Sequence, residues 1–334
     1  MPVSRRVLWM VLGALVAVNG ALFSAWALNA GVFSSQDTNG NYSEASFLED
    51  KSWSFKEYAQ YFYDLAQEKG AAYAYQVLKV APIVPGTDMH LLGHVVADEI
   101  YKQEGVEGIA FCDHDFRNAC SHAIVVGVFL EQGLGGLEEI RQACLKAPGG
   151  KGAYGMCFHG LGHGVLAYHE YNMENAVATC KELEVTTGRA EFIECTGGIV
   201  MEMMSGVNDR EAWERESPRY LSKEDPLNPC NLDFMVKEAR PMCYNYLTPR
   251  LFEAVGTSLA SPKPEDYKKA FPLCELIPEE EPENRTACYG GFGKEFVVLS
   301  KDRDVRNIEN MSDEELSRVY DWCLLANSAF GLES

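Results

Sequence analysis

The sequence predicts an all-α protein built from about six to seven repeated helical hairpins. Three observations support this prediction. Cysteines recur in pairs down the chain, the residues that follow each second cysteine resemble one another, and no stretch alternates polar and apolar residues for long enough to build a sheet. Stacked hairpins form either an open solenoid or a closed α/α toroid, and both arrangements fit the sequence.

Residues 1–28 predict a membrane-targeting segment that is separate from this fold. Arg5 and Arg6 precede residues 7–28, which contain no charged residue. An apolar span of this length can cross a bilayer as a signal-anchor, with the arginines on the cytoplasmic side. The alternative is a cleaved signal peptide with residues 7–18 as its apolar core and cleavage near Ala25-Trp26-Ala27. The uncleaved anchor is the preferred interpretation, and both place residues 29–334 outside the cytoplasm.

The composition of the rest of the chain fits an exported globular protein. The chain has 334 residues, of which 47% are hydrophobic, and a formal net charge of −20 at pH 7. This charge argues against a nucleic-acid partner. We expect membrane contact through residues 7–28, and a small-molecule or protein partner of unknown identity. Eleven cysteines favour an oxidising compartment, where they can pair.

The elements follow in order after a polar segment. Residues 29–50 are rich in Ser, Asn and Gly and predict a flexible stalk, so that the helical-repeat domain spans residues 51–334. Ser54-Phe55-Lys56-Glu57 is a capping box that predicts the first helix. A turn at residues 82–86 then leads into a second helix.

Paired cysteines mark the hairpins from there on. The pairs are Cys112/Cys120, Cys144/Cys157, Cys180/Cys195, Cys230/Cys243 and Cys274/Cys288. The first cysteine of each pair ends one helix and the second begins the next, so a disulfide across the intervening loop is expected. Each such bridge would contribute about 2–3 kcal/mol. A rival scheme joins each second cysteine to the first cysteine of the next unit. Cys323 resembles the first cysteine of a further pair and is left over.

The second cysteines also align the units. They begin Cys120-Ser-His-Ala, Cys157-Phe-His-Gly, Cys195-Thr-Gly-Gly, Cys243-Tyr-Asn-Tyr and Cys288-Tyr-Gly-Gly, and Asp88-Met-His-Leu takes the equivalent place in the first unit. Successive units are 32 to 48 residues apart. Self-similarity with this spacing is typical of stacked supersecondary units.

All seven histidines lie between residues 90 and 169, although the repeat continues beyond them. Two pairs have the H-x3-H spacing, which places both rings on one face of a helix. A third unit between them has a histidine at the matching position. The predicted metal ligands are His90, His94, His122, His159 and His163. Neutral imidazole suits Zn, Cu or Fe, and Glu99, Glu131 or Glu170 could complete the coordination shell.

Other candidate residues carry weaker signals. His114 lies in an acidic loop that we expect to be exposed, with metal binding as the lesser alternative. His169 lies off the helix face that carries His163. Glu202 and Glu295 each follow a second cysteine by seven residues and could serve as acid or base, although surface glutamates are the commoner reading. No hydrolase, P-loop, haem-attachment or redox C-x-x-C motif is present, so catalytic residues are unknown and enzyme activity is open.

Two resemblances accompany these motifs. Cys157-Phe-His-Gly-Leu-Gly-His163 and the C-x-G-G elements resemble those of exported helical-repeat proteins with no assigned activity. Cys157-Phe-His-Gly and Cys288-Tyr-Gly-Gly also resemble, over a few residues in each unit, lanthionine cyclase-like α/α toroids. The second resemblance implies inner helices that begin with glycines and carry zinc-binding Cys and His. This chain departs from that family by pairing its cysteines throughout, which puts a zinc-thiolate role in doubt.

The sequence therefore predicts a membrane-tethered extracytoplasmic helical-repeat protein with a histidine-based metal site. It would bind a transition metal or act on a small molecule or an envelope component. The alternative is a non-enzymatic protein-protein interaction scaffold in which the histidines cap loops or satisfy hydrogen bonds in the core.

Overall fold

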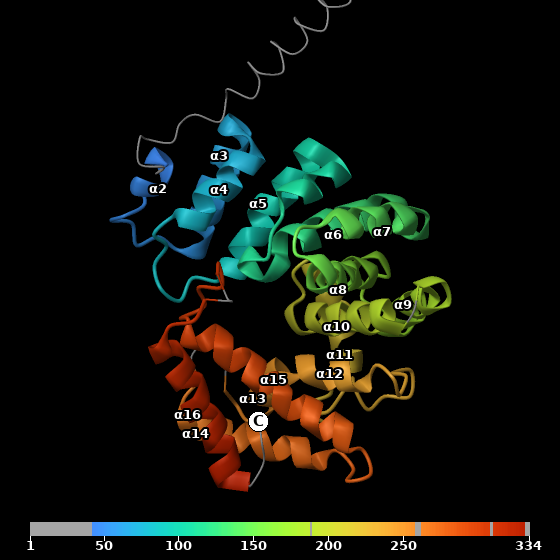
Figure 1. Ribbon diagram of the computed structural model, residues 1–334. Coiled ribbons are helices and arrows are strands. Elements are labelled where there is room, and N and C mark those ends of the chain that lie inside the picture. Colours follow the sequence, from blue (N-terminus) through green and yellow to red (C-terminus); the bar gives the residue numbers. More distant parts are fainter. Residues whose placement is uncertain (1–41, 188, 258–261, 308–309, 331–334) are drawn as a thin grey trace, which may run out of the picture. The chain divides into compact units, whose positions relative to one another are not determined.

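The computed structural model describes residues 42–187, 189–257, 262–307 and 310–330, and these are helical with no strand, as predicted (Figure 1). The predicted anchor at residues 7–28 and most of the predicted stalk lie outside these ranges. The helices are α2 (Ser43–Ser46), α3 (Phe55–Lys69), α4 (Ala71–Val80), α5 (Met89–Glu104), α6 (Ala119–Gln132), α7 (Leu137–Lys146), α8 (Gly150–Tyr168), α9 (Met173–Thr187), α10 (Arg189–Ser205), α11 (Arg210–Tyr220), α12 (Arg240–Tyr246), α13 (Thr248–Ala254), α14 (Pro264–Ala270), α15 (Pro282–Ser300) and α16 (Asp313–Phe330). Short 3-10 turns are η2 (Gly105–Phe111), η3 (Asp115–Asn118), η4 (Gly133–Gly136) and η5 (Phe271–Leu276).

The chain divides into two compact units. The described part of the first comprises residues 42–52 and 80–83 and contains α2. Ala45 in this helix and Leu48 just after it are buried. This helix occupies the end of the stretch predicted as a stalk. The second unit comprises residues 53–79 and the chain from residue 84 onward, and it holds the repeats. The remaining description concerns this second unit.

The first helices of the repeat unit begin at side-chain caps. The predicted capping box at the start of α3 is confirmed, since Ser54 N donates to Glu57 Oε2 at 2.7 Å and the Ser54 side chain accepts from Glu57 N. Asp88 caps α5 by accepting a hydrogen bond from Leu91 N at 3.1 Å. These caps satisfy backbone N–H groups that have no partner within the helix, and so fix where each helix starts.

The five disulfides are confirmed as bridges within hairpins, and the rival connectivity is not adopted. Bonds join Cys112 to Cys120, Cys144 to Cys157, Cys180 to Cys195, Cys230 to Cys243, and Cys274 to Cys288. Their Cα atoms are 5.2–5.8 Å apart. Each bridge therefore ties one repeat helix to the segment that precedes it.

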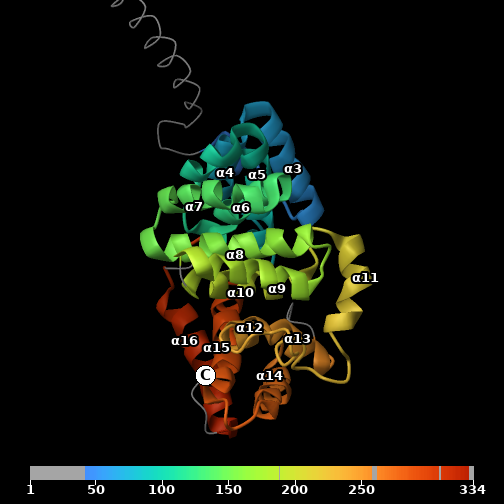
Figure 2. The same ribbon diagram turned by 90° about the vertical axis from the view of Figure 1, so that its right-hand side faces the viewer.

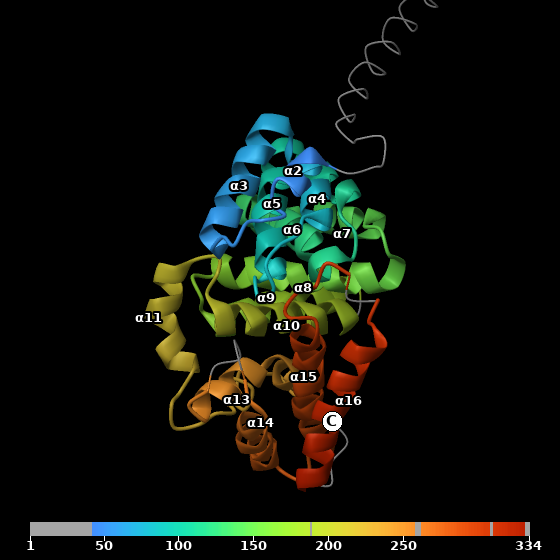
Figure 3. The same ribbon diagram turned by 90° about the vertical axis from the view of Figure 1, so that its left-hand side faces the viewer.

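Six helices occupy the same place in successive repeats and pack against one another in chain order. They are α5, α6, α8, α10, α12 and α15, and we call them the repeat helices. Helices α7 and α9 pack on the α6, α8 and α10 layers, which Figure 2 shows stacked one below another. At the other end of the repeat, α16 packs against α15 and α14 (Figure 3).

Glycines let the central repeat helices touch backbone to backbone. A Cβ added at Gly160 of α8 would lie 2.6 Å from the Cα of His122 on α6. One added at Gly198 of α10 would lie 1.9 Å from the carbonyl oxygen of His159 on α8. Both distances are shorter than any side chain tolerates, so only glycine permits this spacing. The close approach brings side chains of three different helices within reach of one another.

The last repeat returns to the first. Gly86 N, in the loop before α5, donates to Asp302 O in the loop after α15 at 2.9 Å. In the same place Arg303 Nη1 lies 3.9 Å from Asp88 Oδ2. These contacts are compatible with a closed ring and with a tightly curved solenoid.

One stretch passes a composition test for a membrane span. Residues Asp115–Lys146 are long and apolar enough to cross a bilayer, but 61% of their most apolar window is buried inside the protein. This stretch includes α6, which packs between α5 and α8. Such burial is typical of a core helix, and the stretch is only weak evidence for a membrane span.

Candidate metal centre

The five histidines predicted as ligands converge in one cluster. They come from three adjacent repeat helices: His90 and His94 from α5, His122 from α6, and His159 and His163 from α8. The ring of His122 lies centrally, with centroids 5.4–6.0 Å from those of the other four. The nitrogen atoms of His90, His94 and His122 that could serve as ligands lie within 4.8 Å of one another. These three residues form a group that could hold a metal ion.

The α5 and α8 pairs also approach each other. The centroids of His94 and His163 are 6.4 Å apart, although their helices are separated in the repeat by α6. Within each helix the i, i+4 spacing places the rings 4.8 Å apart for His90 and His94 and 5.2 Å apart for His159 and His163. The curvature of the repeat and its glycine contacts therefore gather residues from two H-x3-H motifs into one cluster.

A strained turn orients His90. Its Nδ1 lies 2.6 Å from the carbonyl oxygen of Phe116, and because a carbonyl only accepts, Nδ1 carries the proton and Nε2 keeps its lone pair. Phe116, Arg117 and Asn118 have φ values of 55°, 54° and 63°. Three consecutive non-glycine residues in the left-handed region are costly, and such strain clusters at functional sites.

A carboxylate orients His163. Its Nδ1 lies 3.0 Å from Glu202 Oε2, and Glu202 also accepts from Tyr171 and from the backbone and side-chain N–H groups of Asn208, both at 2.9 Å. Burial alone would raise the pKa of Glu202, but these hydrogen bonds and the His163 ring lower it below its ordinary value. An ionised carboxylate on one imidazole nitrogen leaves the other to bind metal, as outer-sphere carboxylates do at metal sites.

Four imidazole nitrogens in the cluster are buried with no hydrogen-bond partner among the described residues. They are both nitrogens of His122, Nδ1 of His159 and Nε2 of His163. The exposed fractions of these three residues are 1%, 1% and 6%. A buried polar atom without a partner costs about 1–3 kcal/mol, so native proteins rarely retain several in one place without a reason. A bound metal ion would satisfy one nitrogen of His122, and a ligand role for His159 or His163 would satisfy theirs.

Burial favours the neutral form of four of the five histidines. It lowers the pKa of His90 to about 3, and the nearby Arg117 charge adds to the effect. Burial and the neighbouring imidazoles hold the pKa values of His94, His122 and His159 well below their ordinary range. Neutral imidazole is the form that coordinates metal, so no proton has to leave these rings at neutral pH.

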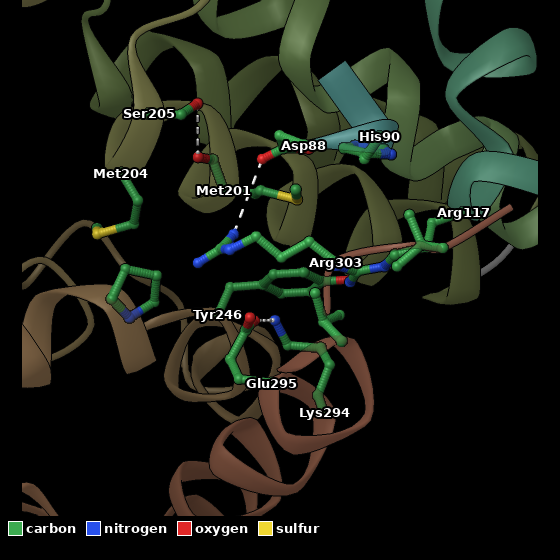
Figure 4. Close-up of a pocket in the computed structure, with 13 residues that line it drawn as sticks. Asp88, His90, Arg117, Met201, Met204, Ser205, Tyr246, Lys294, Glu295 and Arg303 are labelled. Atoms are coloured by element: carbon green, nitrogen blue, oxygen red, sulfur yellow. Dashed lines mark hydrogen bonds and ion pairs between the residues drawn. The ribbon is translucent and has the colours of Figure 1, made fainter. Parts of the chain in front are cut away.

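Two cavities border the cluster. The smaller, of about 180 Å³, is lined by residues that include His90, His94, His163 and Glu202. The larger, of about 250 Å³, is lined by His90 together with residues of α10, α12, α15 and the loop after α15 (Figure 4). The two cavities adjoin, because four residues line both of them: Asp88, His90, Met201 and Ser205. A small molecule in either cavity would lie beside the histidines.

The remaining predicted candidates lie apart from the cluster. Glu99 accepts hydrogen bonds from Gln67 and Lys102, and Glu170 pairs with Arg215 at 3.2 Å. Neither they nor Glu131 line the two cavities. Glu202, predicted only as a possible acid or base, is the carboxylate that contacts the cluster, through His163. His169 contacts Thr179 Oγ1 at 2.7 Å, in agreement with its prediction off the ligand face. Glu295 lines the larger cavity and pairs with Lys294.

The repeat register contains a signal that would have located further residues of the site. One position recurs in every unit, and a second lies four residues after it. The pairs are His90 and His94, His122 and Val126, His159 and His163, Gly197 and Met201, Asn245 and Pro249, and Gly290 and Lys294. All six of these later residues line one or both cavities. The position of the second histidine in H-x3-H, compared across all units, therefore marks Met201 and Lys294 as site residues. Arg117, Tyr171 and Tyr246 have no comparable signal.

Comparison of the chain with protein-family models, curated proteins and solved structures yields no match. The chemistry of the site must therefore carry the functional argument. Imidazoles from three helices, one of them oriented by a carboxylate, can bind a transition metal beside two small cavities.

Proposed function

We propose that this protein is a membrane-tethered extracytoplasmic metalloprotein that uses its histidine cluster to bind a transition metal and to act on a small molecule or an envelope component. The observation that carries the proposal is the set of four buried, unpartnered imidazole nitrogens that belong to three residues of one cluster. Burial without partners is costly, and a bound ion removes this cost for each nitrogen that coordinates it, one from each imidazole ring.

The donor set narrows the choice of metal. Imidazole nitrogen suits Zn, Cu and Fe, whereas Mg and Ca prefer oxygen ligands. His90, His94 and His122 would supply three nitrogens, which is the number found at catalytic zinc sites that keep a position open. Met201 Sδ lies 3.4 Å from His159 Nε2, and a thioether at this place would also tolerate copper. His163, oriented by Glu202, stands ready as a further ligand.

A metal bound at this site would supply Lewis acidity or a bound water of lowered pKa. The protein's own contribution is to orient the ligands and to limit access. The Phe116 carbonyl fixes the tautomer of His90, and Glu202 fixes the ring of His163. The small cavity beside them admits only a few atoms of a substrate, which favours small molecules or the end of a larger chain.

The cysteines and the amino terminus support the proposed compartment. Five disulfides are typical of proteins in an oxidising environment. Residues 7–28 have the length and composition of a signal-anchor, which would leave the repeat domain outside the cytoplasm.

Metal analysis of protein produced in an oxidising compartment tests the proposal. We expect a transition metal in a fixed ratio to protein, and a fall in melting temperature after chelation, because a ligand that binds only the folded state stabilises it. Purified protein that takes up no Zn, Cu or Fe, and whose melting temperature does not respond to chelator, would return the histidines to structural roles and favour the interaction scaffold.

Paired substitutions test whether α5 and α8 share the ion. We expect His94→Ala and His163→Ala each to lower metal affinity by tenfold or more, because their rings face each other across the cluster. His169→Ala is the control, since His169 lies on the same helix end but bonds Thr179 instead. Loss of metal from only one of the two variants would confine the ion to a single helix pair.

A further inference from the structure

The larger cavity gathers charged side chains that the metal proposal does not use. Its lining includes three cations, Arg117, Lys294 and Arg303, and two anions, Asp88 and Glu295 (Figure 4). The cations come from η3, from α15 and from the loop that follows α15. Segments far apart in the sequence thus bring positive charge to one cavity in a protein whose overall net charge is −20.

Two of these cations have carboxylate partners within the cavity. Arg303 Nη1 lies 3.9 Å from Asp88 Oδ2, and Lys294 Nζ is hydrogen-bonded to Glu295. Lys294 Nζ also lies 4.5 Å from the centre of the Tyr246 ring. Within each pair the positive and negative charges cancel, so the cavity lining has one unneutralised positive charge.

That remaining cation is Arg117. Its side chain forms no hydrogen bond or ion pair with any described residue, and it is only partly exposed. A guanidinium carries five N–H donors in a planar fork that matches carboxylate and phosphate oxygens. An arginine that faces a cavity without a protein partner is therefore placed to receive an anion from outside the chain.

The backbone at Arg117 is held in place at a cost. Residues 116 to 118 all have positive φ, and none is glycine. The Cys112–Cys120 disulfide closes this loop, and the Phe116 carbonyl is bonded to His90. The same strained turn thus fixes a histidine of the candidate metal centre and presents the arginine, so the two groups keep a defined relation to each other.

We infer that the larger cavity is a binding site for a small organic anion, whose carboxylate or phosphate group is received by Arg117 beside Lys294 and Tyr246. The cavity volume of about 250 Å³ limits the ligand to a small molecule or to the end group of a longer one. His90 lines this cavity and belongs to the metal-binding group, so the bound anion lies next to the proposed metal. Anion binding stands independently of the metal, whereas its role as the substrate position rests on the proposed function.

The first experiment measures anion binding to the metal-free repeat protein. Full-length protein in detergent, treated with chelator and then desalted, is titrated calorimetrically with inorganic phosphate, with acetate and with neutral acetamide at constant ionic strength. We expect phosphate or acetate to bind with one site per chain and acetamide not to bind. The two anions distinguish a phosphate ligand from a carboxylate ligand. Binding of neither anion at concentrations up to tens of millimolar would overturn the inference.

Substitutions at Arg117 locate the site. Arg117→Asn removes the charge and suits a left-handed backbone, so the fold should persist. We expect it to weaken anion binding tenfold or more, and Arg117→Lys to weaken it less because the charge remains without the fork. Arg219→Gln is the matched control, since Arg219 pairs with Glu174 on the surface. Equal anion affinity in Arg117→Asn and the parent protein would overturn the assignment to this cavity.

Metal content separates this inference from the proposed function. We expect Arg117→Asn to keep its metal while it loses anion affinity, and His94→Ala to lose metal while the chelated protein still binds the anion. Failure of metal binding with retained anion binding would remove the proposed function but leave the anion site. Retained metal binding with no anion binding would remove the anion site but leave the proposed function.

Discussion

Single residues in the histidine cluster differ in what they bond, and this difference is measurable. His122 lies at the centre of the cluster with both ring nitrogens buried and no partner in the described chain. His90, by contrast, has its Nδ1 bonded to the Phe116 carbonyl. Burying the unpartnered nitrogens of His122 therefore costs free energy that burying the hydrogen-bonded Nδ1 of His90 does not.

We predict that His122→Leu makes the metal-free protein more stable, by about 1–3 kcal/mol, because an apolar side chain of similar size replaces two unsatisfied nitrogens. The same substitution should abolish or strongly weaken metal binding. Urea unfolding in the presence of chelator measures the first effect, and metal titration measures the second.

His90→Leu is the matched control for that prediction. It leaves the Phe116 carbonyl without its donor and should lower the stability of the metal-free protein by about 1–3 kcal/mol. If His122→Leu destabilises the metal-free protein as much as His90→Leu does, the nitrogens of His122 have partners and the reason for assigning a metal disappears.

At the scale of elements, glycine decides how closely the repeat helices approach. Gly160 on α8 faces the backbone of His122 on α6, with 2.6 Å from an added Cβ to the His122 Cα. Gly155, on the same helix, has only ordinary contact, with 3.8 Å to Glu194 Cγ. The two glycines share one helix and differ in what lies opposite.

We predict that Gly160→Ala destabilises the protein by about 1–3 kcal/mol and weakens metal binding, because the backbone of α6 has to move away and carry His122 with it. Gly155→Ala should instead stabilise by about 0.5–1 kcal/mol, since alanine is the better helix former where space allows. Thermal unfolding and metal titration of both variants check the contrast. Equal effects at the two positions would show that α6 and α8 do not depend on close contact.

The elements and their crosslinks were predictable because their signals are local. A capping box marks the start of α3, and the ends of adjacent helices place each cysteine pair within bonding distance whatever the curvature of the repeat. The repeat register likewise placed five histidines on matching helices. What this register could not supply is the side chains that meet them. Glu202 reaches His163 from the next helix. The register marked Glu202 only as a possible acid or base, while Glu99, Glu131 and Glu170 were the carboxylates predicted to complete the coordination shell.

At the scale of the whole molecule, curvature decides which distant residues meet. The sequence left an open solenoid and a closed ring as alternatives. The hydrogen bond from Gly86 to Asp302 joins the two ends of the repeat, and a curvature of this kind brings Lys294 to the same cavity as Arg117. Such contacts depend on small rotations summed over all units, which no single repeat encodes. The repeat register marks Lys294, but nothing in the sequence indicates that Arg117 lines the same cavity.

Burial of several neutral histidines in one place gives the whole molecule a characteristic dependence on pH. Burial holds the pKa values of His94, His122 and His159 well below the ordinary value, and lowers that of His90 to about 3. In the unfolded chain each histidine regains a pKa of about 6.5. Below pH 6.5 the unfolded state therefore binds protons that the folded state does not, and stability must fall as the pH falls.

We predict that the metal-free protein has its full stability above about pH 6.5 and loses about 1.4 kcal/mol for each such histidine by about pH 5.5. Urea unfolding at pH 7.5 and 5.5 measures the loss. Glu202 does not contribute in this window. Its folded-state pKa is lowered, so its stabilising effect is lost only when the pH falls below about 4.3, where an unfolded glutamate titrates. His122→Leu should reduce the loss by the share of one histidine, since it removes one group that the unfolded state protonates. A stability that stays flat between the two pH values would mean that the cluster is already protonated or hydrated when folded, and the buried neutral imidazoles on which the metal proposal depends would not exist.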